Sequence, residues 1–519
     1  MFARLKASFI PQPQQQIKVQ CANALNNAAL SRFEMDPLIP AESIGRIGVG
    51  NKEAKNVTAG NTDNFEEEDK KNSKPFFDVI IHYAVRFAGT IHMFILLWAL
   101  LIAWIIWGCI KNGPDQWQIV MQDGQSIQTY VWDTFLMRQQ LDDTEGFLTT
   151  YGKLKSRNRT IKRLIEKMIT NEKENPIMKK REESSLKTEY NVEYKSLTYF
   201  DRLSNKVSNI MGSVTSISFY WIGIFIWVGM GAYPILVDGK LETWSDKWQM
   251  TINTATAVEL LVTSVFLQNI RTRNNDLMRN QLEIFDEFDA KLELLTRYIM
   301  EDDTPNPEVI VQHCPREGIE WWISKYSDII GTGIGLIISI IVFAIWIGIG
   351  PVMSWNDDWW LIIGTYTGLV GFIDGFILRE VFFKITEYEE SKFYELLEDS
   401  HQLLDLLSLQ YPTPNRNTKK STLDRISETA NKWCSCKWAV LSSVFMVIIL
   451  LIISSVLKWS TTGQLIANTP TMIIEGFFLL FLIRAHNWAD KTRRIWLEEL
   501  TIVRAVMVKE VERRWGQNL

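Results

Sequence analysis

The sequence predicts an all-α polytopic membrane protein with eight transmembrane helices, arranged as four tandem two-helix repeats. Four long apolar runs carry no charged residue, and a polar segment of similar length follows each run. Twenty-one tryptophans among 519 residues suit the aromatic belts found where membrane helices meet the water interface. The five cysteines are mostly far apart and predict no disulfide framework.

The N-terminal region differs in composition from the rest of the chain. Residues 1–74 are polar, rich in Gln and Asn and interrupted by Pro and Gly, and we expect a disordered cytoplasmic tail. The first residues contain no apolar core of a signal peptide, so insertion should depend on the first spanning helix.

Eight segments have the length and composition to cross a membrane. The charge-free runs are residues 93–110, 210–237, 329–355 and 438–457. The second, less apolar segments are residues 117–137, 248–270, 359–378 and 465–483. Each charge-free run and the second segment after it belong to one expected unit. The four units are residues 75–200, 201–315, 316–415 and 416–519.

The second segments resemble one another. Phe135-Leu136 and Phe266-Leu267 fall at the same offset from Trp117 and Trp248, and the third and fourth segments share I-D-G-F and I-E-G-F. A repeated unit of this kind predicts helix pairs with equivalent packing. The first unit is the most diverged.

Lysine and arginine predict the orientation. They gather in the long loops, above all in residues 138–206, whereas the four short turns are neutral or acidic. The positive-inside rule therefore places both termini and the long loops in the cytoplasm. Each second helix should extend into the cytoplasm as an amphipathic stalk, for example DLMRNQLEIFDEFDAKLELL.

The second segments also carry the chemistry. Each contains a carboxylate, namely Asp133, Glu259, Asp374 or Glu475. A charge is costly in hydrocarbon, so these side chains should face the interior of the bundle. Their offsets differ by about one helical turn, so all four can share one face of equivalent helices. Hydroxyl and amide groups predicted on the same faces add further candidate metal ligands: Thr256, Thr367, Thr471 and Asn468.

If the four faces meet, their carboxylate, hydroxyl and amide groups form a column of oxygen atoms. This column suits a hard or borderline divalent cation, since His and Cys are few. His486, three turns beyond Glu475, is a candidate ligand at the inner mouth or a helix-capping residue. Cys434 and Cys436 lie next to a spanning segment, and both binding of a soft metal and palmitoylation are compatible with their position. In the alternative interpretation the acids only pair with nearby arginines and hold the helices together; these are Arg138, Arg271, Arg379 and Arg484.

The stretch 244–288, with FDRLSNKVSNIMGS before it, resembles the low-affinity iron(II) permease family of fungi and its short bacterial relatives. The matching motifs are FDR, W-S-D-K-W-Q, I-N-T-A-T and F-L-Q-N followed by N-N-D-L. The resemblance covers residues 80–400 and 425–510 but not the tail. It implies low-affinity uptake of ferrous iron across the plasma membrane, with copper, zinc and other divalent metals tolerated.

The sequence lacks motifs that are typical of other functional classes. We find no Walker motif, catalytic triad or GxGxxG, so we expect no enzyme and no permanently bound cofactor; Fe²⁺, with copper and zinc, is the cargo. The expected partners are membrane lipid and the metal ion, and we expect no binding of nucleic acid. A homo-oligomer is compatible with the sequence. Two alternatives are a divalent cation channel and a non-conducting scaffold or sensor that acts through its stalks.

Overall fold

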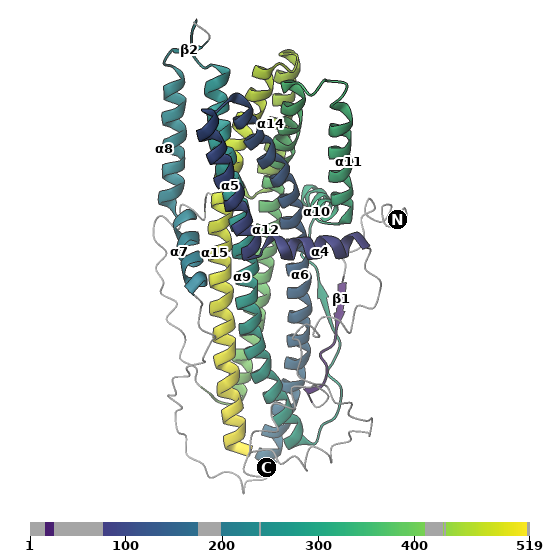
Figure 1. Ribbon diagram of the computed structural model, residues 1–519. Coiled ribbons are helices and arrows are strands. Elements are labelled where there is room, and N and C mark those ends of the chain that lie inside the picture. Colours follow the sequence, from purple (N-terminus) through teal and green to yellow (C-terminus); the bar gives the residue numbers. More distant parts are fainter. Residues whose placement is uncertain are drawn as a thin grey trace.

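Four long helices form the centre of the molecule. The computed structural model describes residues 16–24, 76–174, 199–237, 240–409, 429 and 432–515. The long helices run side by side along its length (Figure 1) and are α6 (Asp115–Glu174), α9 (Asp246–Met300), α12 (Asp357–Leu406) and α15 (Thr461–Trp515). Both α6 and α15 pack on α9 and on α12, so the cyclic order in the ring is α6, α9, α15, α12.

Four shorter helices surround one half of this ring (Figure 1): α5 (Ile91–Lys111), α8 (Val214–Gly231), α11 (Gly333–Ile349) and α14 (Lys437–Val456). Each precedes one long helix in the sequence and packs on the next long helix around the ring. The contacts are α5 on α9, α8 on α15, α14 on α12 and α11 on α6. Large apolar side chains cover their outer faces, including Ile102, Phe225, Ile345 and Ile452.

Lead-in helices precede three of the shorter helices: α4 (Phe76–Ala88), α7 (Tyr199–Met211) and α10 (Ile319–Ile330). The sequence had suggested one helix for each charge-free run, but two of the runs are broken. Residues 210–237 break at Gly212, where the Ser213 side chain caps α8, and end in β2 (Ile235–Val237). This strand pairs antiparallel with β3 (Lys240–Glu242), which follows the run. Residues 329–355 divide between α10 and α11, which are bent by 69°.

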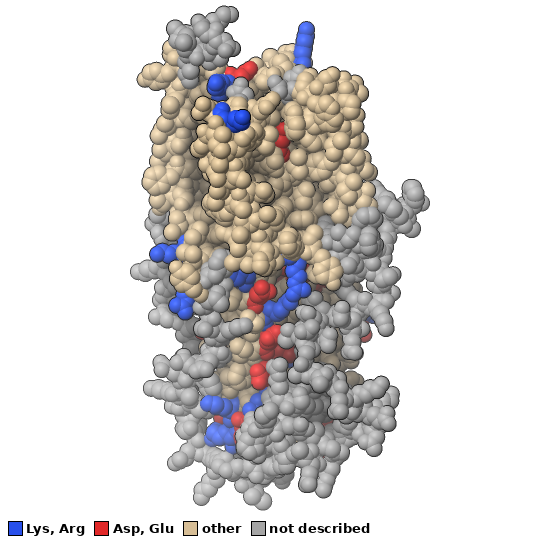
Figure 2. Space-filling view, viewed as in Figure 1, with Lys and Arg blue, Asp and Glu red and all other residues tan. Residues whose placement is uncertain are grey.

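Six described helices are long and apolar enough to cross a membrane, or up to seven if α10 and α11 count as one span. In Figure 2 the visible face of the half that contains the short helices is built mostly of uncharged residues. Charged residues gather at its outer rim and toward the opposite half. The protein is therefore a multi-pass, mostly helical membrane protein.

Pairs of tryptophans join the helices at three of the four short turns. The indole rings of Trp104 and Trp117 stack at 4.0 Å, and each donates a hydrogen bond to the other's carbonyl oxygen, at 3.0 and 2.8 Å. Two further pairs have the same arrangement, Trp227 with Trp248 and Trp346 with Trp359. At the fourth turn Ser454 Oγ donates to the Gly463 carbonyl at 3.0 Å instead.

The other half of the ring is the stalk, which comprises residues 138–174, 271–300, 379–406 and 484–515. Apolar side chains from all four helices fill its interior, among them Ile165, Leu295, Leu404 and Val508. The amphipathic pattern of the stalk segments thus buries one face of each helix.

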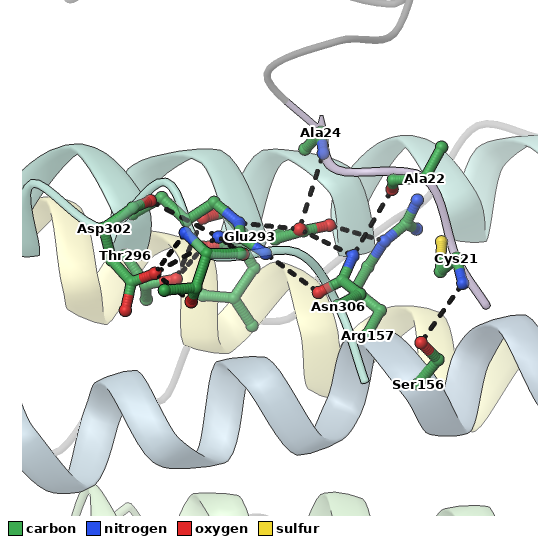
Figure 3. Close-up of polar contacts among 12 residues, drawn as sticks. Cys21, Ala22, Ala24, Ser156, Arg157, Glu293, Thr296, Asp302 and Asn306 are labelled. Carbon is green, nitrogen blue, oxygen red and sulfur yellow. Dashed lines mark hydrogen bonds and ion pairs between the residues drawn. The ribbon is translucent and has the colours of Figure 1, made fainter. Parts of the chain in front are cut away.

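The N-terminal segment 16–24 lies along this stalk. Its strand β1 (Gln16–Val19) pairs antiparallel with β4 (Val309–Gln312). The Cys21 amide donates to Ser156 Oγ at 3.1 Å, and the Asn306 side chain donates to the Ala22 carbonyl at 3.3 Å (Figure 3). A disordered tail was the wrong expectation for these nine residues, because hydrogen bonds to distant parts of the chain order them; the rest of residues 1–74 lies outside the described residues.

A network of charged residues, most of them buried, lies beneath this segment. Arg157 binds Asp286, Asp289 and Glu293, at 2.6, 3.1 and 2.9 Å. Glu293 also binds Arg297 at 2.8 Å and accepts a hydrogen bond from the Ala24 amide at 3.4 Å (Figure 3). The network ties α6 and α9 to the N-terminal segment, so the stalk is a structured part of the protein.

Candidate functional site

The four predicted acids lie in the half of the ring that the short helices surround. Asp374, Glu475 and Asp133 are 1%, 5% and 6% exposed, and the Oε2 atom of Glu259 is buried. Glu475 interacts electrostatically with Glu259 and Asp374, and Asp133 interacts with Asp374 and Glu475. The ring therefore brings together one group of carboxylates from four different helices.

Three glycines of α12 face oxygen atoms from the neighbouring helices. Gly364, Gly368 and Gly371 follow one another at spacings of four and three residues, which places them on one side of the helix. We call this side the α12 glycine face. Because these residues have no side chains, the space in front of α12 is open to groups from α6 and α15.

Distances from an ideal Cβ position show which atoms use this space. At Gly371, this position lies 3.5 Å from both carboxylate oxygens of Glu475 and 3.6 Å from Asp133 Oδ2. At Gly368 it meets the Asn468 amide oxygen and lies 3.5 Å from Thr471 Oγ1. Carboxylate, amide and hydroxyl oxygens thus follow the glycine face for about two turns.

Glu259 approaches α15 instead. Its Oε2 atom lies where a Cβ atom of Gly476 would stand, next to the residue that carries the Glu475 carboxylate. Thr263 donates a hydrogen bond to Glu259 Oε1 at 3.1 Å, and no hydrogen-bond donor reaches Oε2 in the described part of the chain. The glycine of I-E-G-F therefore makes room for the acid of another unit.

Asp374 has a partner that the sequence analysis missed. The Tyr326 hydroxyl of α10 donates to Asp374 Oδ1 at 2.7 Å, whereas Oδ2 has no partner among the described residues. Tyr326 precedes Asp374 by 48 residues, and no motif or periodicity connects them. Only the packing of α10 beside α12 reveals the contact.

None of the four acids forms an ion pair with any residue that the structure describes. The arginines expected as alternative partners make other contacts. Arg138 binds Asp142 and Arg271 binds Asp143, both at 3.2 Å. Arg484 donates to the Gly212 carbonyl at 3.2 Å, and the Arg379 guanidinium lies 4.3 Å from the centre of the Phe478 ring. These contacts argue against the interpretation in which arginines neutralise the acids.

The expected hydroxyl ligands are buried and keep lone pairs available. Thr256, Thr367 and Thr471 donate to backbone carbonyls of their own helices, at 2.9, 2.7 and 2.7 Å. A hydroxyl that donates in this way can still accept a hydrogen bond or bind a cation through its oxygen. The Asn468 amide oxygen is buried without a hydrogen-bond partner among the described residues.

His486, the candidate ligand at the inner mouth, lies in a buried position beside an aromatic ring and two arginines. Its buried ring packs on Phe382, with 4.0 Å between the ring centroids. Arg271 and Arg493 are close enough to act on it electrostatically. Both guanidinium groups are themselves paired with carboxylates. The inner-mouth ligand therefore stays a prediction for His486.

The first unit contains a second buried carboxylate, Asp123, which the sequence analysis also missed. It is 4% exposed, and an ideal Cβ position at Gly364 lies 3.3 Å from its Oδ1 atom. The signal available in the sequence was a second acid in segment 117–137, ten residues before Asp133. Among the described residues, no three His, Cys, Asp or Glu side chains are grouped so as to hold one metal ion.

Comparisons with known proteins agree with this architecture. The model of the family "Low affinity iron permease" matches residues 321–403 and 423–513. The low-affinity Fe(2+) transport protein of Saccharomyces cerevisiae is 44% identical over 472 residues, which are 86% of this chain and 85% of that protein. The low-affinity iron/zinc ion transport protein of Schizosaccharomyces pombe is 41% identical over 441 residues, which are 83% and 72% of the two chains. No solved structure matches. The chain belongs to the low-affinity iron permease family.

Proposed function

We propose that this protein carries Fe²⁺ and other divalent transition metals, zinc and copper among them, into the cell at low affinity through the centre of its four-helix ring. The relatives named above are transport proteins for iron or for iron and zinc. The observation that carries the proposal is the convergence of Asp133 and Glu475 on the α12 glycine face without an ion-pair partner among the described residues.

The chemistry of this group suits a passing cation. Three buried carboxylates and the partly buried Glu259, with no ion-pair partner among the described residues, attract positive charge strongly, because a low-dielectric surrounding screens them little. Carboxylate, hydroxyl and amide oxygens can replace water around Fe²⁺ or Zn²⁺ one ligand at a time. Binding at several weak sites lets the ion leave as well as arrive.

The membrane potential supplies a driving force for this uptake. An inside-negative potential favours the inward movement of a divalent ion by about 4.6 kcal/mol per 100 mV, which is twice the value for a single charge. Passive uptake is therefore sufficient, and the proposed mechanism uses no nucleotide. Asp133, Glu259, Asp374 and Glu475 act as the charged ligands, and Thr256, Thr367, Thr471 and Asn468 as neutral ones.

We further propose eight spans in four tandem units, with both termini in the cytoplasm and the protein in the plasma membrane. The cyclic packing of each short helix on the next long helix supports equivalent units. The three tryptophan pairs and the Ser454–Gly463 hydrogen bond occupy the same place in the four turns and support them as well. In this topology α6 and α11 cross the membrane with the other six helices.

A charge-neutralising substitution tests the function. Glu259→Gln keeps the size and hydrogen bonding of the side chain, and we expect ferrous uptake by cells to fall by about tenfold, the equivalent of one lost charged contact. Glu283→Gln, at an exposed position in the stalk part of the same helix, is the control and should transport normally. Unchanged uptake by a normally abundant Glu259→Gln protein would count against the pathway.

A further inference from the structure

Asp123 is a buried carboxylate without a counter-ion, outside the group of four acids. Only 4% of the residue is exposed, its Oδ2 atom has no hydrogen-bond partner, and no ion pair reaches it from the described residues. A buried charge in this state is costly, so the carboxyl group is either protonated or compensated by a cation. A divalent cation in front of Asp123 would supply the missing positive charge.

The surroundings of Asp123 provide further oxygen atoms. The ideal Cβ position at Gly364 lies 3.3 Å from Asp123 Oδ1 and 3.9 Å from Ser126 Oγ, so both groups approach the α12 glycine face together. One turn along this face, the unpartnered amide oxygen of Asn468 lies at Gly368. The ideal Cβ positions of residues one turn apart on a helix are separated by roughly 5–6 Å, so the Asn468 oxygen and the Asp123 carboxylate approach α12 at neighbouring levels of the glycine face.

This cluster is separate from the four acids. Asp123 precedes Asp133 by ten residues, or about 15 Å along a helix at 1.5 Å per residue. Gly364 precedes Gly371 by seven residues, or about 10 Å by the same measure. A single ion cannot bind both carboxylate levels at metal–oxygen distances near 2 Å. Asp123 is also the acid closer to the turn between α5 and α6.

We infer that Asp123 forms an outer cation site in which Asp123, Ser126 and Asn468 bind a partly hydrated divalent metal ion in front of Gly364 and Gly368. The inference rests on the proposed transport function and adds a first binding step to it. An ion arriving from the turn end exchanges part of its water here before it reaches the four acids. The outer site therefore sets the metal concentration needed for transport, and the four acids set the maximum rate.

Flux into proteoliposomes tests this division. Zn²⁺, which does not oxidise, is added outside vesicles that contain the full chain and a zinc-sensitive dye. Asp123→Asn should raise the half-saturating Zn²⁺ concentration by at least about fivefold, with a much smaller change in the maximum rate. Gly364→Ala brings a methyl group against Asp123 and should shift the same parameter in the same direction, whereas Gly375→Ala, which meets open space on the same helix, should not.

A change of ligand class gives a second readout. Asp123→Cys replaces a hard oxygen by a soft thiolate, and the half-saturating concentration should fall for Cd²⁺ relative to Mn²⁺. A purely structural role for Asp123 would leave this ratio unchanged. If Asp123→Asn does not accumulate in membranes, Gly364→Ala, with Asp123 intact, is compared with Gly375→Ala for the same shift.

The outcomes separate the two proposals. If Asp123→Asn and Gly364→Ala transport Zn²⁺ with the half-saturation of the unaltered protein while Glu475→Gln stops transport, the outer site is wrong and the transport function stands. If vesicles with the unaltered protein take up no more Zn²⁺ than protein-free vesicles, the transport function fails and the outer site fails with it.

Discussion

Gly371 of α12 faces the carboxylate of Glu475 on α15, and a Cβ atom at this glycine would lie 3.5 Å from each of the two carboxylate oxygens. Asp133 of α6 reaches the same point from the other side, at 3.6 Å. Helix α12 packs between α6 and α15 in the ring, so a residue without a side chain allows both acids to approach the centre. The glycine thus contributes to the proposed pathway by leaving space.

Filling that space should impair transport more than folding. In Gly371→Ala the added methyl group meets its neighbours at ordinary contact distances, so we expect normal abundance. The methyl group occupies the position in front of both carboxylates, and we expect uptake to fall by about tenfold, at the lower end of the effect of one extra carbon in a fitted site. Uptake of Fe²⁺ or Zn²⁺ by cells, normalised to protein abundance, measures the effect.

Gly375→Ala is the matched control for this substitution. It lies one turn further along the same helix, and no atom of the described residues stands within 4 Å of its ideal Cβ position. Equal transport by the two variants would show that the space at Gly371 has no part in conduction.

Neutralising a pathway acid and neutralising a paired acid should affect stability differently. Glu475→Gln removes a buried charge that has no ion-pair partner among the described residues, so thermal unfolding in detergent should shift little or upward. Glu389 of the stalk binds Arg493, and among the described residues Glu389→Gln leaves that arginine with one ion pair, to Asp490 at 3.4 Å. We expect a loss at the lower end of the roughly 3–5 kcal/mol typical of a broken buried pair. A larger loss of stability in Glu475→Gln would support a structural role for this acid.

The tryptophan pairs should stabilise the turns by a modest amount each. Trp248→Phe keeps an aromatic ring for stacking on Trp227 but loses the hydrogen bond to the Trp227 carbonyl, at 3.2 Å. We expect the free energy of unfolding to fall by about 1 kcal/mol, as measured by denaturant or thermal unfolding. Trp322→Phe, at an exposed position of α10, should change it much less.

Cys21 reports on the attachment of the N-terminal segment to the stalk. Its thiol is buried, and this burial raises its pKa from 9.0 to about 11. The reactive thiolate is therefore scarce below pH 9, and alkylation should be slow and keep accelerating toward pH 11. Asn306→Ala removes the hydrogen bond to the Ala22 carbonyl and should increase the rate at pH 8. Equal rates in the two proteins would mean that this contact does not hold the segment in place.

The acids and their inward position could be predicted from the sequence, because charge is costly in hydrocarbon and each second segment carries one. Asp123 was harder to single out because it lies within a polar run of the most diverged unit. The contact between Tyr326 and Asp374 and the function of the α12 glycine face depend on the order of the helices around the ring. No pattern within a single helix specifies that order.

The errors in the shorter elements have local causes. The break at Gly212, and the one at Gly331 between α10 and α11, interrupt apolar runs that hydropathy alone presents as continuous. A Ser or Thr follows each glycine, however, and favours a new helix start. Strand β1 is only four residues long, and its partner β4 lies nearly 300 residues later in the chain. Such a distant pairing gives no local signal.

The most direct test of the pathway is Fe²⁺ flux into proteoliposomes under anaerobic conditions and an imposed inside-negative potential. The unaltered protein should speed Fe²⁺ influx above that of protein-free vesicles, and the rate should increase as the potential becomes more negative. Glu475→Gln, reconstituted at the same density, should reduce this influx by about tenfold or more. Equal potential-dependent influx through the unaltered protein and Glu475→Gln would contradict transport through the carboxylate group.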